Sequence, residues 1–194
     1  MMMNRINGWM EWLERRDPLL ALRPGETWNA SLDEEIAKLE AVDWPGKEEE
    51  ALALKAGLLL WNGSLDRSHA ISQQVETPWG SLWHGVMHRM EGDYGNAKYW
   101  FHMAGSLPVF EKLQKAVAEA IGCGPRAAGL PPSRVADSIA AIAEQREWHP
   151  FLFVDAVTAQ ERGQGGERTR SLLETIQHAE LSMLVRHCAA RVID

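Results

Sequence analysis

The chain has 194 residues, of which 45% are hydrophobic and 24% charged. Its net charge of −7 argues against a nucleic-acid partner or an anionic membrane surface, because both favour basic proteins. Two cysteines, Cys123 and Cys188, are too few for a disulfide framework, so we expect a reducing, cytoplasmic setting. The longest apolar run, residues 56–61, is far shorter than the roughly 20 residues of a membrane-spanning helix. We therefore expect a soluble protein without a membrane partner.

The N-terminal part of the chain is predicted to contain two helices. Apolar residues between positions 6 and 13 have the spacing of one helix face, and Pro18 ends that helix. Ser31 and Glu34 fit a capping box, with Ser31 as the N-cap residue and Glu34 reaching back to it. This pattern predicts a second helix from Ser31 to about residue 39.

Two helical hairpins are predicted in the middle of the chain. A helix over residues 48–61 closes at Gly63, and a second hairpin turns at Gly92. The second unit resembles a tetratricopeptide repeat in its small and aromatic positions. These positions are Gly85, Gly92, Asp93, Tyr94, Ala97, Phe101 and Ala104. We expect two packed hairpins in a short tetratricopeptide-like stack.

The C-terminal part is also predicted to be helical, over residues 134–146, 149–161 and 167–192. Residues 122–133 are rich in glycine and proline and form the only candidate boundary within the chain. The residues that follow this loop are few for an independent core. We therefore expect an all-α protein with a single helical domain over residues 1–194.

The candidate chemistry lies in the two hairpins. His84 and His88 are four residues apart and lie one helical turn from each other, with Glu91 on the same side. On the preceding helix, His69 and Gln73 share a face. Two imidazoles at this spacing can hold one metal ion, and a carboxylate one turn further on can bind it or orient a ligand. If the hairpins stack side by side, a pocket lined by these residues is expected.

This pattern leaves three interpretations open. In the first, His69, His84 and His88 bind a divalent transition metal, and the sequence does not choose among Zn, Ni, Fe and Mn. In the second, the pocket holds no metal and its histidines and carboxylates transfer protons or recognise a ligand, with Glu91 and Asp93 as candidate catalytic residues. In the third, the polar groups form a buried network that fixes helix packing.

Further polar and aromatic residues of the same segment are candidates for ligand binding. They are Gln73, Arg89, Asn96, Lys98, Tyr99 and Trp100. A guanidinium fork and an indole face can hold an anionic or planar small molecule. Ion pairs with Glu91 and Asp93 are the simpler interpretation of the two cations, Arg89 and Lys98. Asp155, Gln177 and Glu180 lie on later helices with apolar neighbours, so they could point inward and support the site, although a solvated face is again the simpler interpretation.

The run from Trp83 to Phe101 resembles a motif of a family of small helical bacterial and fungal proteins, written WHxxxHRxExDxxNAKYWF. The matching positions are Ser68, His69, Gln73, Trp83, His84, His88, Arg89, Glu91, Asp93, Asn96, Lys98, Tyr99, Trp100 and Phe101. The resemblance implies that these residues form a family signature, and it brings no reaction with it. The chain has Leu107 where the family pattern has a histidine.

Motifs for nucleotide binding and for nucleophilic catalysis are absent from the sequence, including GxxxxGK[ST], GxGxxG after a strand, GxSxG and CxxC. Two functional hypotheses remain. The first is a small-molecule or metal-binding pocket, with metal-assisted or acid–base hydrolysis as the reaction class if the protein is an enzyme. The second is a tetratricopeptide-like interaction module that binds a partner peptide and has no catalytic activity.

Overall fold

The computed structural model describes residues 2–122 and 129–193, and Cys123 lies outside them together with half of the predicted loop. The predicted all-α fold is confirmed, because the described residues form helices and no strand. The helices are α1 (Met2–Glu14), α2 (Ala30–Ala37), α3 (Glu48–Trp61), α4 (Leu65–Ser72), α5 (Pro78–Glu91), α6 (Tyr94–Ala104), α7 (Phe110–Gly122), α8 (Arg134–Ala143), α9 (Pro150–Glu161) and α10 (Glu167–Ile193), with one 3-10 turn, η1 (Ala41–Asp43).

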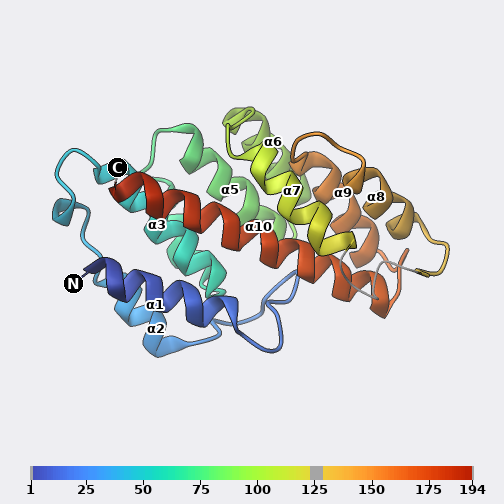
Figure 1. The fold of residues 1–194 in the computed structure, drawn as a ribbon, viewed down its shortest axis with the longest axis horizontal. Coiled ribbons are helices and arrows are strands. Elements are labelled where there is room, and N and C mark those ends of the chain that lie inside the picture. Colours follow the sequence, from blue (N-terminus) through green and yellow to red (C-terminus); the bar gives the residue numbers. More distant parts are fainter. Residues whose placement is uncertain (1, 123–128, 194) are drawn as a thin grey trace.

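The longest helix, α10, crosses most of the molecule (Figure 1). It contacts α1, α3, α7, α8 and α9, so it joins the N-terminal and C-terminal parts of the fold. The hairpin formed by α5 and α6 lies between two neighbours, because α5 contacts α3 and α4 while α6 contacts α9. One side of α5 therefore faces the core, and the other side faces α4 and α6.

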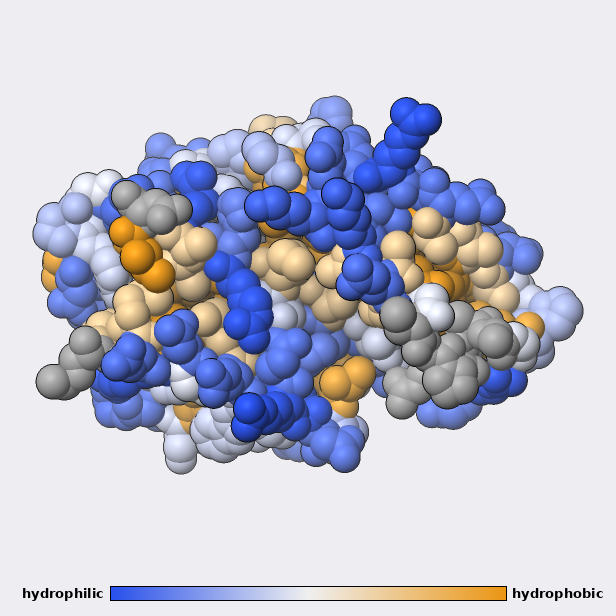
Figure 2. Space-filling model, in the orientation of Figure 1, coloured by the Kyte–Doolittle hydropathy of each residue, from blue (hydrophilic) through white to orange (hydrophobic). Residues whose placement is uncertain are grey.

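The surface is mostly hydrophilic on the face that α10 crosses, with apolar patches of limited size between charged side chains (Figure 2). Within the described part of the chain, no helix combines the length and the apolar content that crossing a membrane requires.

Glycines close both central hairpins, as predicted. Gly63 follows α3 with φ of 83°, and Gly92 caps α5 with φ of 98°. The Gly92 N–H donates hydrogen bonds to the carbonyls of His88 and Arg89, which would otherwise lack a donor at the end of the helix. A residue with a Cβ is strained at such φ values, so glycine is the residue that allows each turn. The tetratricopeptide-like character of the stack stays a prediction.

The start of α2 differs from the sequence interpretation. Asn29, and not Ser31, is the N-cap residue, since its side chain accepts a hydrogen bond from the Leu32 N–H at 2.8 Å. Ser31 lies inside the first turn, because the helix begins at Ala30. Asparagine caps helices about as well as serine, so the sequence offered two equivalent starts. The predicted partner Glu34 pairs instead with Arg67, and the capping box was wrong.

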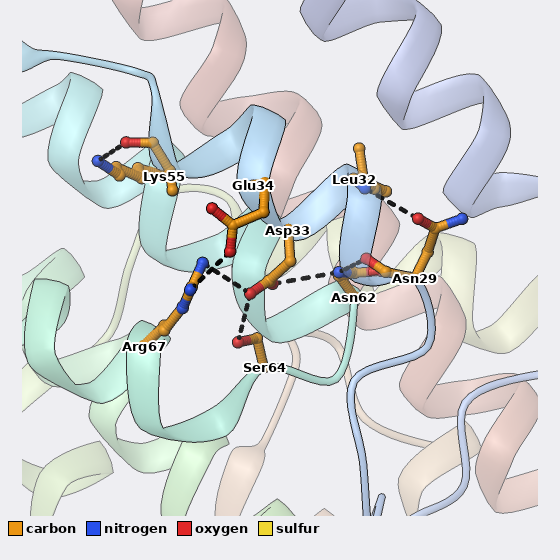
Figure 3. Close-up of polar contacts among 9 residues, drawn as sticks. Asn29, Leu32, Asp33, Glu34, Lys55, Asn62, Ser64 and Arg67 are labelled. Atoms are coloured by element: carbon orange, nitrogen blue, oxygen red, sulfur yellow. Dashed lines mark hydrogen bonds and ion pairs between the residues drawn. The ribbon is translucent and has the colours of Figure 1, made fainter.

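A buried carboxylate on α2 links this helix to the first hairpin. Asp33 is only 5% exposed and accepts hydrogen bonds from Asn62 and Ser64, which follow α3 (Figure 3). Arg67 on α4 pairs with the same carboxylate at 3.0 Å. The charge of Asp33 is therefore paired and hydrogen-bonded, as a buried charge must be. This cluster fixes α2 on the first hairpin.

The second hairpin is tightly packed because α5 carries a glycine where α6 crosses it. A Cβ at Gly85 would lie 2.6 Å from the ring of Phe101, which is 1% exposed. Trp83, Trp61 and Trp148 are also fully buried and fill the surrounding core. The close approach holds α6, with its polar residues, against the histidine-bearing face of α5.

Candidate functional site

Three histidines from two helices meet at one place in the fold. His69 on α4 and His84 on α5 have ring centroids 5.1 Å apart, and the ring of His88 lies 5.4 Å from that of His69. The centroids of His84 and His88 are 6.3 Å apart. The structure thus brings together the three residues that the helical spacing selected as metal ligands.

These rings line a polar pocket of about 590 Å³, named here the histidine pocket. Helix α4 and the loop after it form one wall, α5 forms the floor, and α6 forms the opposite wall. The lining residues are His69, Ser72, Gln73, Val75, Glu76, Ser81, His84, His88, Asn96 and Trp100. The pocket opens to solvent at Gln73 and Glu76, whose side chains are exposed.

His84 is held in one orientation from both sides. Its Nδ1–H donates to the carbonyl of Gly80 at 3.0 Å, and its ring stacks on Trp100 with centroids 4.2 Å apart. Burial lowers the pKa of His84, and the nearby His69 and His88 lower it further, against the opposing effect of the Gly80 hydrogen bond. A neutral imidazole with its proton on Nδ1 leaves the Nε2 lone pair available to a ligand.

Gly80 is the point at which α5 meets the loop before it. A Cβ at Gly80 would lie 2.0 Å from the Val75 carbonyl oxygen, so only glycine allows this approach. The same residue supplies the carbonyl that orients His84. The position of the loop and the orientation of the buried histidine therefore depend on one backbone segment.

His88 is oriented by a carboxylate and an amide. Its Nδ1–H donates to Glu91 Oε2 at 3.1 Å, and its Nε2 accepts from Asn96 Nδ2 at 3.1 Å. His69 follows the same pattern on α4, where Gln73 Nε2 donates to His69 Nε2 at 3.1 Å. In all three histidines the unprotonated nitrogen is therefore Nε2.

No three His, Cys, Asp or Glu side chains of the described residues are already grouped so that they could hold a metal ion. The amides of Gln73 and Asn96 occupy two of the imidazole nitrogens that a metal would need. As it stands, the pocket is a hydrogen-bonded network that can accept protons or bind a polar ligand.

Three predicted ligand-binding residues do not line the pocket. Arg89 is fully buried on the opposite side of α5, where it forms a two-pronged ion pair with Glu180. Lys98 pairs with Asp155 on α9 at 2.6 Å. Tyr99 is 55% exposed and contacts the edge of the Trp100 ring. The two cations are therefore in ion pairs, as expected, but with Glu180 and Asp155 in place of the predicted Glu91 and Asp93. The solvated-face interpretation was wrong for Glu180 and Gln177, which are fully buried.

The predicted catalytic carboxylates have different roles in the structure. Glu91 is an exposed side chain that contacts the pocket only through His88. Asp93 is the N-cap of α6, since its side chain accepts a hydrogen bond from the Asn96 N–H at 3.1 Å. Neither carboxylate lines the pocket itself, so Glu91 has the geometry of a positioning residue and Asp93 that of a helix cap.

Sequence reasoning missed four lining residues, namely Ser72, Val75, Glu76 and Ser81. Ser72 and Ser81 lie three residues from His69 and His84, so helical periodicity was a signal that could have found them. Val75 and Glu76 lie in a loop, whose path helical spacing does not predict.

Comparison of the chain with protein-family models, with curated proteins and with solved structures finds no match.

Proposed function

We propose that the histidine pocket binds one divalent transition metal ion through His69, His84 and His88 and uses it in the hydrolysis of a small polar molecule. The observation that carries this proposal is the convergence of three imidazoles on one solvent-accessible pocket, with ring centroids 5.1–6.3 Å apart. Around a shared zinc ion, imidazole centroids stand roughly 5 Å apart, given metal–nitrogen bonds of about 2 Å. Side-chain rotations would have to bring the Nε2 atoms together, because no metal-binding group is preformed among the described residues.

The ring tautomers support nitrogen ligation. Metal-bound histidines usually donate their second N–H to a carboxylate or a backbone carbonyl, which orients the ring. His88 makes the first kind of contact with Glu91, and His84 makes the second kind with Gly80. Metal binding would replace the amide donors Gln73 and Asn96, which now bond to two of the Nε2 atoms.

A three-histidine site leaves a coordination position for water, and the metal would supply a hydroxide near neutral pH. The other residues of the pocket would then hold the substrate. Asn96 and Gln73 offer amide groups, and Trp100 offers an aromatic surface beside His84. Among the described residues, no lysine or arginine lines the pocket, so substrate recognition would depend on hydrogen bonds and stacking and not on an anion clamp.

Metal content tests the first half of the proposal. Protein purified without a histidine tag and dialysed against Zn, Mn, Ni or Fe(II) should retain close to one equivalent by elemental analysis. The His84→Ala/His88→Ala variant should retain almost none. His102→Ala is the matched control, because His102 is an exposed histidine on α6 outside the pocket. Substoichiometric metal in the parent protein, or retention in the double variant, would contradict the proposal.

Hydrolysis tests the second half. Metal-loaded protein is assayed on p-nitrophenyl acetate and on an uncharged p-nitroanilide, with the double variant as background. We expect turnover that depends on added metal and disappears in the variant. Equal rates for the parent protein and the variant would contradict the proposed catalytic role but not the proposed metal binding.

A peptide-binding module is the second candidate, and exposed apolar residues on α6 favour it. Tyr99 and Met103 lie one helical turn apart and are 55% and 53% exposed. Grooves that bind peptides use such aromatic and methionine side chains. In a screen of immobilised peptides, a Tyr99→Ser/Met103→Ser variant should lose the bound sequences, while metal content stays unchanged.

A further inference from the structure

A second cavity of about 240 Å³ lies where the start of α3, the start of α5 and the end of α10 meet. We name it the apolar pocket. Figure 1 shows the end of α10 beside α3, at the end of the molecule where the chain also begins. Of its lining residues, Ala53, Trp79, Leu107 and Cys188 are each less than 10% exposed. These side chains form an apolar interior that is separate from the histidine pocket.

The largest wall of the apolar pocket is held rigidly. The indole of Trp79 stacks on the ring of His187 with centroids 5.1 Å apart and an interplanar angle of 17°. Burial lowers the pKa of His187, and the charges of Arg191 and Lys112 lower it further, so the ring is an uncharged support for the indole. A flat aromatic wall in a fixed orientation suits a flat ligand, because such rings gain energy from stacking.

The thiol in the pocket adds to its apolar character. Burial raises the pKa of Cys188 to about 12, so the thiol stays protonated at neutral pH and acts as a small apolar group. It provides neither a thiolate nucleophile nor a soft metal ligand.

Charges at the rim are balanced or solvated. Arg191 on α10 and Glu50 on α3 form an ion pair at 3.1 Å across the entrance. Glu49, the other charged residue of the rim, is exposed, so its carboxylate can remain in water. Among the described lining residues each charge is therefore paired or in water, and a charged ligand would lose its hydration without gaining a partner.

We infer that the apolar pocket is a binding site for a small, uncharged aromatic molecule of about two fused rings. An apolar cavity of about 150 Å³ is enough to hold benzene, and this pocket is larger, with about 240 Å³. The ligand lies against Trp79 and excludes water from Ala53 and Leu107. This site is independent of the proposed metal chemistry, since the two pockets share no lining residue.

Indole is the probe that tests this inference, by isothermal titration calorimetry and by changes in methyl NMR resonances. We expect saturable binding of one indole per chain. Tryptamine and indole-3-acetate should bind at least about tenfold more weakly, because their charges must be desolvated. Ala53→Leu should weaken indole binding at least about tenfold, because the added carbons take up the space.

A matched variant separates the two pockets. Ser81→Leu places the same side chain in the histidine pocket and should leave indole binding unchanged. If Ala53→Leu lowers the thermal stability, Leu107→Ala replaces it as the test. This change enlarges the apolar pocket and should shift the preference from indole toward 2-methylnaphthalene.

Any one of four results would overturn the inference, and the first three concern indole binding. They are the absence of saturable indole binding, binding that is lost in Ser81→Leu and kept in Ala53→Leu, and charged indoles that bind as tightly as indole. An unchanged ligand preference in Leu107→Ala would overturn it as well.

Discussion

Two neighbouring residues of α5 each contact a carboxylate, one in the core and one at the surface. Arg89 and Glu180 are both fully buried, and the guanidinium also lies over the Phe153 ring, 4.4 Å from its centroid. His88 pairs with Glu91 on the other side of the helix, where the Glu91 side chain is 59% exposed. The first pair links α5 to α10 through residues far apart in sequence. The second stays within one helical turn.

The difference shows that one side of α5 stabilises the fold while the other side carries the candidate site. A buried ion pair adds little net stability to the fold. Removing one partner is nevertheless strongly destabilising, because the remaining charge is buried away from water. An exposed pair contributes little to folding and leaves its imidazole accessible to ligands. The side of α5 that faces α10 therefore fixes the helix, and the side that faces α4 and α6 carries the candidate site.

The largest expected effect comes from breaking the buried pair. Glu180→Gln leaves the Arg89 charge buried without a carboxylate and should cost about 3–5 kcal/mol of folding free energy. Urea denaturation followed by circular dichroism measures this loss. The Arg89→Met/Glu180→Leu variant is the control and should recover most of the stability, since it removes both charges. A loss below about 1 kcal/mol in Glu180→Gln would show that water reaches the pair.

The second effect concerns the close contact between α5 and α6. Gly85→Ala should destabilise the protein by about 1–3 kcal/mol, because the new Cβ overlaps the Phe101 ring. Thermal denaturation measures the change. Gly8→Ala in α1 is the matched control, since a Cβ there meets no atom within 4 Å. That control should gain up to about 1 kcal/mol from helix propensity, and equal effects at the two positions would contradict the packing argument.

The third effect involves a half-exposed pair between α1 and α10. Burial alone would raise the pKa of Glu14, but hydrogen bonds from His178 and Ser182 and the charge of Arg186 outweigh it and lower the pKa to about 2. The stabilisation is therefore present above the unfolded-state pKa and is lost as pH falls from about 4.5 toward 2.

Glu14→Gln should reduce stability at pH 7 by about 1 kcal/mol at most, because solvent screens this pair. The difference from the parent protein should shrink as the pH falls through that window, as measured by urea denaturation at several pH values. Glu11→Gln on the exposed face of the same helix is the control and should show no such trend. A difference that does not vary with pH would contradict the assignment.

The smallest effect on folding is expected at the exposed pair of the site. Glu91→Gln should change the folding free energy by about 0.5 kcal/mol or less. On the proposed function it should weaken metal binding about 10–100-fold, because His88 loses its orienting carboxylate. Competition with a chromogenic chelator measures this. Asp155→Asn breaks the comparably exposed pair with Lys98 and should leave metal affinity unchanged.

Local patterns predicted the helices and the pocket histidines well. Spacing of three and four residues is enough to place His84 and His88 on one face, and glycine at Gly63 and Gly92 marks the hairpin turns. These features depend only on neighbours within one or two turns. The capping box at Ser31 failed for the same reason, because Asn29 gave an equally good local start.

Contacts between distant residues were beyond prediction from one sequence. Arg89 was a candidate for ligand binding, with an ion pair to a carboxylate nearby in sequence as the simpler interpretation, yet its partner Glu180 lies on another helix. The tertiary packing that buries both side chains decides this contact. The apolar pocket could not be predicted for the same reason, since Ala53, Trp79 and Cys188 come from three separate helices.

The loop between α4 and α5 is a partition between the two pockets. Val75 and Glu76 face the histidine pocket, while Thr77 and Trp79 face the apolar pocket. Gly80 packs closely against the Val75 carbonyl, and its own carbonyl orients His84. A shift of this loop would therefore change the orientation of the His84 imidazole. A ligand that displaced this loop from one side would alter affinity on the other, and by thermodynamic reciprocity the two affinities would change by the same factor.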